Sequence, residues 1–225
     1  MLTVVFLHGV ASSSLETYHS ALKYLEGTKS LENVRFVAFD SLGSEKSYAS
    51  DKLDYDYKCQ LEALENSLKK LGINTPLVLV GHSMGTFIAT RYTYDHKKTV
   101  KHLVLISPPV YIPENLTDPA FLAGMVAFKK IIVSRNKKYE NDKAFNNEIK
   151  YIVMNKYNYQ RLAELTTKAT LIYSEADQII MPKNIRKVAK ENPKYLKAVA
   201  TIGTHRVARD KYGKLVGILE EVING

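Results

Sequence analysis

The sequence predicts an α/β fold: a mostly parallel central sheet of about six strands, flanked by helices and carrying a helical cap insertion. Short apolar runs rich in β-branched residues alternate with longer amphipathic segments, which implies right-handed crossovers. The runs are continuously apolar, as is typical of strands covered on both faces. With 225 residues, 45% of them hydrophobic and 24% charged, the chain suits one domain with a large core.

Each element follows from its local pattern. The predicted strands are residues 3–7, 34–39, 77–80, 102–106, 169–173 and 198–202. Helical periodicity covers residues 15–25, 57–71, 84–94, 185–190 and 215–223. The second helix is the clearest, because apolar side chains recur at spacings of three and four from Tyr57 to Leu71, and Gly72 follows as a stop signal.

One long interval interrupts this alternation. Residues 108–165 contain apolar helical segments and no strand pattern, and a structureless loop of that length would be unusual. We therefore predict a core in residues 1–107 and 166–225, with 108–165 forming a helical cap over the carboxyl ends of the strands. Most apolar side chains of the cap are expected in the core and a minority in a substrate pocket. The predicted pocket residues are Phe121, Met125, Phe128, Tyr139 and Tyr151.

The strongest local signal is the run Gly81-His82-Ser83-Met84-Gly85, which lies between a predicted strand and a predicted helix. This context is the one that a nucleophile elbow requires, because small residues on either side of the serine permit a very sharp turn. The helix that follows also favours negative charge at its N-terminus. Ser83 is therefore the candidate nucleophile, and His82 is expected to point away from the partners of its hydroxyl.

A serine hydroxyl needs a base to take its proton, and histidine is the usual one. Among the six histidines, only His205 follows the last predicted strand, where the topology needs a base. The others lie in the first loop, in the elbow, beside helices or at the start of a strand: His8, His19, His82, His96 and His102. His205 is therefore the candidate base.

The base in turn needs an acid to hold its tautomer. Asp177 follows the strand 169–173 and is the preferred candidate, with Glu175 a distant second. The chain order of Ser83, Asp177 and His205 matches a known order of triad residues.

A developing oxyanion needs two backbone N–H donors. The first is expected from Met84, directly after the nucleophile, and the second from Val10 in the loop after the first strand. Ala11 is the alternative to Val10. The serines at positions 12–14 are expected to cap the next helix rather than to react.

Together these motifs resemble the α/β-hydrolase superfamily, and most of all its compact capped serine esterases and the monoglyceride lipase or lysophospholipase-like branch. The resemblance rests on the following residues: Leu7-His8-Gly9-Val10, Asp40-Ser41-Leu42-Gly43 with Ser47, Gly81 to Gly85, Asp177 with Pro182, and Gly203-Thr204-His205. It implies a parallel sheet, a Ser83–His205–Asp177 triad and a lid after the strand that ends at Ile106. The two leading strands of the full family fold are not expected, and Asp40 is expected to be structural.

The predicted activity is hydrolysis of small-molecule carboxylic esters with short to medium acyl chains, through an acyl-enzyme and without a metal or other cofactor. Two alternatives remain open. The first is another reaction on the same triad: amide hydrolysis, acyl transfer, perhydrolysis or carbon–carbon bond hydrolysis. The second is a hydrolase fold used only to bind a ligand, against which the intact set of triad residues argues.

The net charge of +9 is unevenly distributed. Residues 183–214 hold ten basic side chains against Glu191 and Asp210. The simplest interpretation is a solvated surface, and the alternative is weak contact with an anionic surface. Nucleic acid is not an expected partner, because no recognised binding motif accompanies the charge.

The sequence also bears on location. It has no run of about 20 apolar residues, so no transmembrane segment is expected. The apolar start lacks a preceding basic region, which argues against an export signal and favours the cytoplasm. A single cysteine, Cys59, excludes an intramolecular disulfide and multi-cysteine metal sites.

Overall fold

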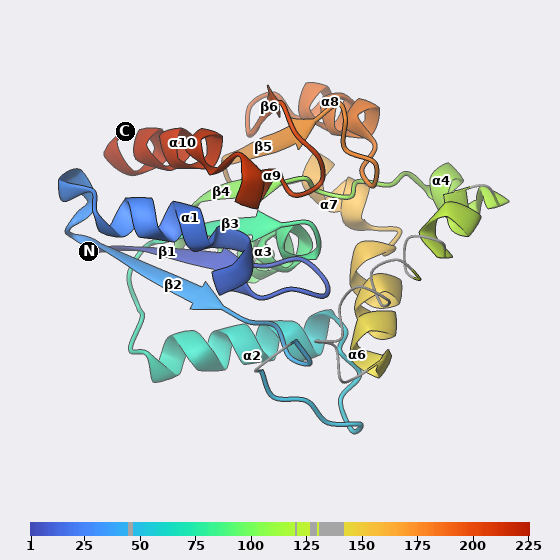
Figure 1. Cartoon of the computed structure of the whole chain (residues 1–225), viewed down its shortest axis with the longest axis horizontal. Coiled ribbons are helices and arrows are strands. Elements are labelled where there is room, and N and C mark those ends of the chain that lie inside the picture. The colour runs from blue at the N-terminus through green and yellow to red at the C-terminus, as the bar shows by residue number, and fades with distance from the viewer. Residues whose placement is uncertain (45–46, 120, 127–129, 131–141) are drawn as a thin grey trace.

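The structure, a computed structural model, describes residues 1–44, 47–119, 121–126, 130 and 142–225 (Figure 1). Its six strands form one sheet in the order β2-β1-β3-β4-β5-β6, and every neighbouring pair is parallel. The strands are β1 (Leu2–Leu7), β2 (Val34–Phe39), β3 (Leu77–His82), β4 (Val100–Ile106), β5 (Ala169–Ser174) and β6 (Leu196–Thr201). The predicted fold class is confirmed.

Helices cover both faces of the sheet (Figure 1). Alternate side chains of each central strand enter two apolar clusters: Val5 and Leu7 enter the first, Val4 and Phe6 the second. The first cluster contains α2 (Tyr57–Lys70), α3 (Met84–Asp95), α7 (Asn158–Ala163) and α8 (Pro182–Glu191). The second contains α1 (Ser14–Glu26), α9 (Val207–Asp210) and α10 (Tyr212–Asn224). A short 3-10 helix, η1 (Lys29–Leu31), precedes β2.

The predicted elements are all present, with small differences at their ends. The strands β4 and β6 each begin two residues earlier than the apolar runs suggest, because backbone pairing starts at Val100 in β4 and at Leu196 in β6. The expectation that all strands are covered on both faces is wrong for β2 and β6. These two strands lie at the edges of the sheet, where most of their side chains are partly or fully exposed. The helix α2 ends as predicted, with Gly72 at φ +64°.

The segment between β4 and β5 adds no strand to the sheet in its described part. It contains α4 (Pro113–Thr117), α6 (Asp142–Asn147), the π-helix η2 (Glu148–Val153) and α7. Several of its apolar side chains, Ile152 and Leu162 among them, are buried in the first cluster. The fully buried Glu148 accepts a hydrogen bond of 3.1 Å from Gln60 Nε2 of α2. The segment is therefore packed onto the core through both apolar and polar contacts.

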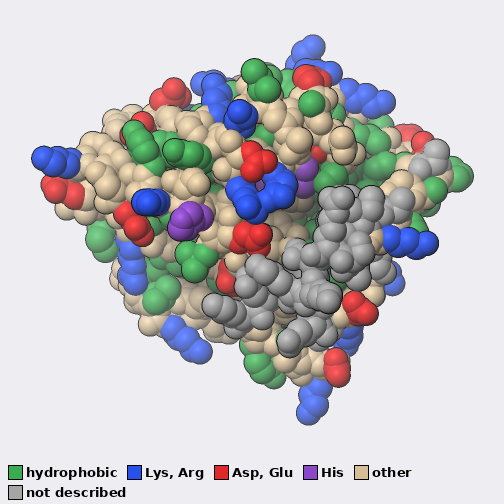
Figure 2. Space-filling model, in the orientation of Figure 1, with side chains coloured by type: hydrophobic (Ala, Val, Ile, Leu, Met, Phe, Trp, Pro, Cys, Tyr) green, Lys and Arg blue, Asp and Glu red, His purple; other side chains and the backbone are tan. Residues whose placement is uncertain are grey.

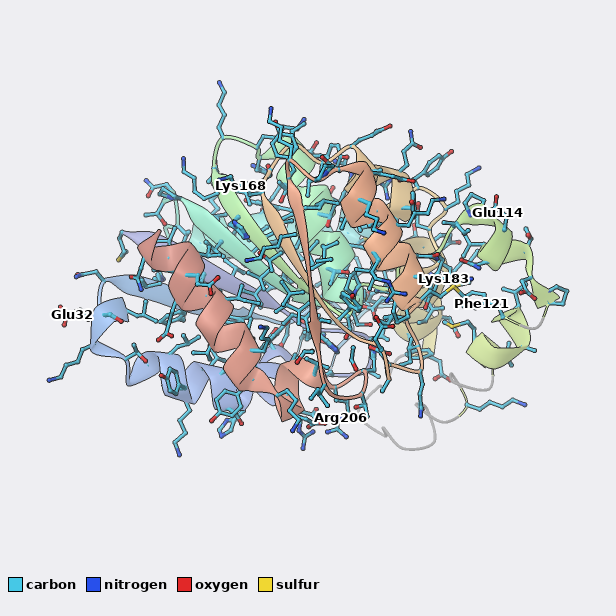
Figure 3. All side chains as sticks on the ribbon, turned by 90° about the horizontal axis from the view of Figure 1, so that it is seen from above. Glu32, Glu114, Phe121, Lys168, Lys183 and Arg206 are labelled. Carbon is cyan, nitrogen blue, oxygen red and sulfur yellow. The ribbon has the colours of Figure 1, made fainter. Side chains whose placement is uncertain are left out.

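The basic stretch 183–214 does not form one patch. It begins on α8, which packs on the first face of the sheet, passes through the edge strand β6, and ends on α9 and α10 at the second face. Figure 3 accordingly shows Lys183 on α8 well apart from Arg206 beside α9. The charge run in the sequence is thus divided by the sheet into separate groups.

Candidate active site

The elbow turns within a single residue. The strand β3 ends at His82 and α3 begins at Met84, so Ser83 alone reverses the chain, with φ +50° and ψ −118°. Positive φ is strained for a residue with a side chain, and such strain persists only where the surroundings enforce it. Here the Ser83 N–H donates to the Ile106 carbonyl at 2.9 Å, which ties the turn to β4. The Ser83 residue is 6% exposed.

The two glycines of the motif are required by close backbone contacts. A Cβ on Gly81 would lie 2.5 Å from the Gly85 carbonyl oxygen. A Cβ on Gly85 would lie 2.3 Å from the Leu7 carbonyl oxygen and 2.7 Å from that of His8. Since β1 and β3 are paired neighbours, these contacts hold the elbow against the end of β1, where the first loop begins.

We expect Gly85→Ala to destabilise the protein by about 3 kcal/mol, because its methyl group must displace the backbone of β1. The measurement is the free energy of unfolding from denaturant titration. The matched control is Gly217→Ala in α10, where a Cβ would meet no atom within 4 Å. That control should stabilise the protein by about 0.5–1 kcal/mol through helix propensity. Equal stabilities of the two variants would contradict the steric account of the elbow.

His205 and Asp177 are in contact although 28 residues separate them. His205 Nδ1 lies 2.9 Å from Asp177 Oδ2 and 3.1 Å from Oδ1. Asp177 Oδ1 also accepts from the N–H groups of Ile179 at 2.9 Å and Ile180 at 3.3 Å. The carboxylate therefore receives donors from both sides, and its orientation is defined by the backbone that follows it.

Two opposing influences act on the pKa of Asp177. Burial would raise it, whereas the hydrogen bond and positive field of His205, together with the Ile179 N–H, lower it. The net pKa lies below the usual value, so the group is ionised at neutral pH. Glu175, the second candidate acid, is instead exposed and paired with Arg186.

The expectation for His82 is wrong. Its side chain does not point away from the candidate base: its Nε2 lies 2.8 Å from the His205 carbonyl oxygen, and the two rings are 5.1 Å apart. Burial, and to a smaller extent the neighbouring His205, lower the pKa of His82 to about 3, so His82 is neutral. Because a carbonyl only accepts, His82 Nε2 must carry the proton. His82 therefore supports the loop that holds His205.

A buried histidine also holds the loop after β1 in place through hydrogen bonds. His8 Nδ1 donates to the Gly9 carbonyl at 2.6 Å, and His8 Nε2 accepts from the Ser41 N–H at 3.0 Å. A Cβ on Gly9 would lie 3.0 Å from Ser83 Cβ, so this loop passes directly beside the nucleophile candidate. Val10, the expected second oxyanion donor, follows at once and is half-buried.

Helix α1 starts from the same loop. Ala11, the alternative donor, has φ +55°, and Ser13 caps the helix by accepting from the Glu16 N–H at 3.2 Å. Asp40 Oδ1 accepts from the Ser14 N–H at 2.7 Å. Asp40 is therefore a structural group at this helix end, as the sequence suggested.

A cavity of about 1100 Å³ opens above the elbow. Ser83, His205 and Val10 all line it. Of the predicted pocket residues, Phe121 and Met125 line this cavity, and Met125 also lines a second, apolar cavity of about 420 Å³ within the segment between β4 and β5. Tyr151 lines neither cavity and is 39% exposed. Phe128 and Tyr139 lie outside the described residues.

Sequence reasoning missed several residues at this site. Gln178, Arg206 and Arg209 line the cavity, although the sequence marks the two arginines only as part of a charge run. The one available signal was closeness along the chain, of Gln178 to Asp177 and of the two arginines to His205. Among the described residues, no group of three or more His, Cys, Asp or Glu side chains is arranged to hold a metal ion.

The fold and the elbow place this chain in a known class. A family model described as alpha/beta hydrolase fold matches residues 3–152, and the chain belongs to that family. Solved structures share the architecture. A hydrolase from Oleispira antarctica, olei00960, has a TM-score of 0.80 at 16% identity, over 100% of this chain and 92% of that one. The esterase EaEST from Exiguobacterium antarcticum has a TM-score of 0.75 at 18% identity, with the same coverage.

Curated relatives include lysophospholipase-like proteins. The probable lysophospholipase BODYGUARD 2 of Arabidopsis thaliana is 32% identical over 131 residues, which are 57% of this chain and 27% of that protein. The (lyso)-N-acylphosphatidylethanolamine lipase of Mus musculus is 35% identical over 72 residues, 32% of this chain and 20% of that protein. The chain thus spans less than a third of the length of these relatives. Among its described residues, no helix is both long and apolar enough to cross a membrane.

Proposed function

We propose that the protein is a serine hydrolase that cleaves small carboxylic esters through Ser83, His205 and Asp177. One observation carries the proposal: a serine on a strained elbow and a histidine bonded to a buried carboxylate line the same cavity. The relatives named as esterases and lysophospholipases agree with ester hydrolysis as the reaction class.

The chemistry proceeds in two half-reactions. His205 takes the proton of Ser83, whose oxygen bonds to the ester carbonyl carbon, and the N–H groups of Met84 and Val10 donate to the oxyanion. As the tetrahedral intermediate collapses, the bond to the alkoxy oxygen breaks and His205 protonates that oxygen, releasing the alcohol. A water molecule, deprotonated by His205, then attacks the acyl-enzyme and frees the acid and Ser83.

The segment 108–165 acts as the cap in this proposal and supplies the acyl pocket. Phe121, Met125, Ile149 and Val153 line the cap side of the cavity and present apolar surface to an acyl chain. Because apolar contact increases with each buried methylene, kcat/KM should rise with acyl length until the chain fills this region. A short to medium chain is the proposed preference.

The test is hydrolysis of p-nitrophenyl esters of increasing acyl length, together with labelling by a fluorophosphonate. We expect turnover with a maximum at short to medium chains, and label on the peptide that contains Ser83. Hydrolysis with the label on another residue would contradict the assignment of the nucleophile. If a folded sample neither hydrolyses the esters nor takes the label, the protein is not a serine hydrolase.

A further inference from the structure

The cavity above the elbow has two chemically different walls. The cap side is apolar, as described above. The opposite side comes from the start of α1 and from α9 with the loop that leads into it, and it carries hydroxyl and charged groups. These are Ser12, Glu16, Thr17, Thr204, Arg206 and Arg209. A cavity divided in this way suits an amphiphilic substrate, with one apolar end and one polar end.

The charges of the polar wall do not cancel. Arg209 is paired with Glu16, with 3.3 Å between Arg209 Nη1 and Glu16 Oε1. In the described part of the chain no carboxylate forms an ion pair with the guanidinium of Arg206, which is exposed at the cavity edge. Figure 2 shows basic side chains grouped near the middle of the face that carries α1 and α9, with acidic side chains beside them. Among the described residues, Arg206 thus gives this wall a positive charge that no carboxylate pairs.

The position of Arg206 indicates which end of a substrate it would meet. In the proposed function, His205 donates a proton to the alkoxy oxygen that leaves, so the alcohol portion of the ester must lie next to His205. Arg206 is the next residue along the chain, and its N–H is held by the Thr204 hydroxyl at 3.3 Å. Phe121, on the acyl side, lies well away from Arg206 in Figure 3. The alcohol portion therefore leaves toward the guanidinium.

We propose that Arg206 forms a subsite for an anionic group, a carboxylate or a phosphate, on the alcohol portion of the ester. This inference rests on the proposed function and adds a substrate class to it. A guanidinium offers a planar set of donors that matches both anions, and a charge-assisted pair is stronger than a neutral one. The apolar cap and the arginine would then select esters whose acyl end is apolar and whose alcohol end is charged.

The test compares esters that share a butanoyl group. The anionic ones are 4-(butanoyloxy)benzoate and 4-(butanoyloxy)phenyl phosphate, and the neutral one is methyl 4-(butanoyloxy)benzoate. The variants are Arg206→Gln and Arg206→Lys, and Lys214→Gln is the matched control. Lys214 is an exposed cation of the same basic stretch that does not line the cavity. The readout is the ratio of kcat/KM for an anionic ester to kcat/KM for the neutral ester. This ratio is compared between wild type and variant, so that the different reactivities of the leaving groups cancel.

We expect Arg206→Gln to lower this ratio about three- to tenfold, Arg206→Lys to restore part of it, and Lys214→Gln to leave it unchanged. Added NaCl should lower the wild-type ratio. The two anionic esters show whether carboxylate or phosphate is preferred. An equal loss on all esters in Arg206→Gln would overturn the proposal, since it would mean that Arg206 only supports the His205 loop. If wild type hydrolyses no ester, the proposed function fails and this inference fails with it.

Discussion

Replacing Ser83 by alanine is expected to reduce kcat/KM for p-nitrophenyl esters by at least about 10⁴-fold while the fold is retained. The variant lacks the oxygen that forms the acyl-enzyme, and the histidine cannot substitute for it. The fold should survive because alanine carries the same Cβ as serine at φ +50°, so the strain of the elbow does not change. The backbone hydrogen bond from residue 83 to Ile106 is also kept.

The measurements are initial rates, fluorophosphonate labelling and the melting temperature. Ser41→Ala is a suitable control, because it also removes a buried hydroxyl near the carboxyl edge of the sheet. Ser41 does not line the cavity, and its N–H bond to His8 is retained in the variant. We expect the control to take the fluorophosphonate label as wild type does. Normal turnover in Ser83→Ala would contradict the assignment of Ser83 as the nucleophile, and the proposed function would fail with it.

Replacing Asp177 by asparagine is expected to lower kcat/KM by about 10³–10⁴-fold, although the side chain keeps its shape. Oδ1 accepts from the N–H groups of Ile179 and Ile180, so that position must remain an oxygen in the variant. The amide nitrogen then occupies the Oδ2 position, 2.9 Å from His205 Nδ1. Because an amide nitrogen donates, His205 must accept at Nδ1 and carry its proton on Nε2. A histidine in that tautomer cannot take the proton of Ser83.

Glu175→Gln provides the matched comparison for this effect. It makes the same chemical change two residues earlier, on an exposed side chain that pairs with Arg186. We expect its kcat/KM to stay within about twofold of wild type, because an exposed ion pair contributes little. Circular dichroism should show both variants folded. If Asp177→Asn kept its activity and Glu175→Gln lost it, the acid would have to be reassigned to Glu175.

The elements that the sequence predicted correctly depend on local patterns. Strands with both faces buried are visible as apolar runs, and helices as a repeat of three and four residues. The edge strands were predicted as buried because an apolar run does not reveal its place in the sheet order. The contact between His82 and the loop of His205 was missed for a related reason. It joins residues 123 positions apart, and it depends on the direction of one side chain.

By itself, then, the sequence determined the fold class, the sharp turn at Ser83 and the choice of Asp177 and His205 as its candidate partners. Glycine spacing and the order of strands and helices are sufficient for these, because both are properties of the chain. Only the tertiary structure decided that His82 supports the His205 loop and that Arg206 faces the cavity. It also separated the charges of α8 from those of α9 and α10. These features depend on which surfaces the packed sheet brings together, and charge or histidine content along the chain does not encode that directly.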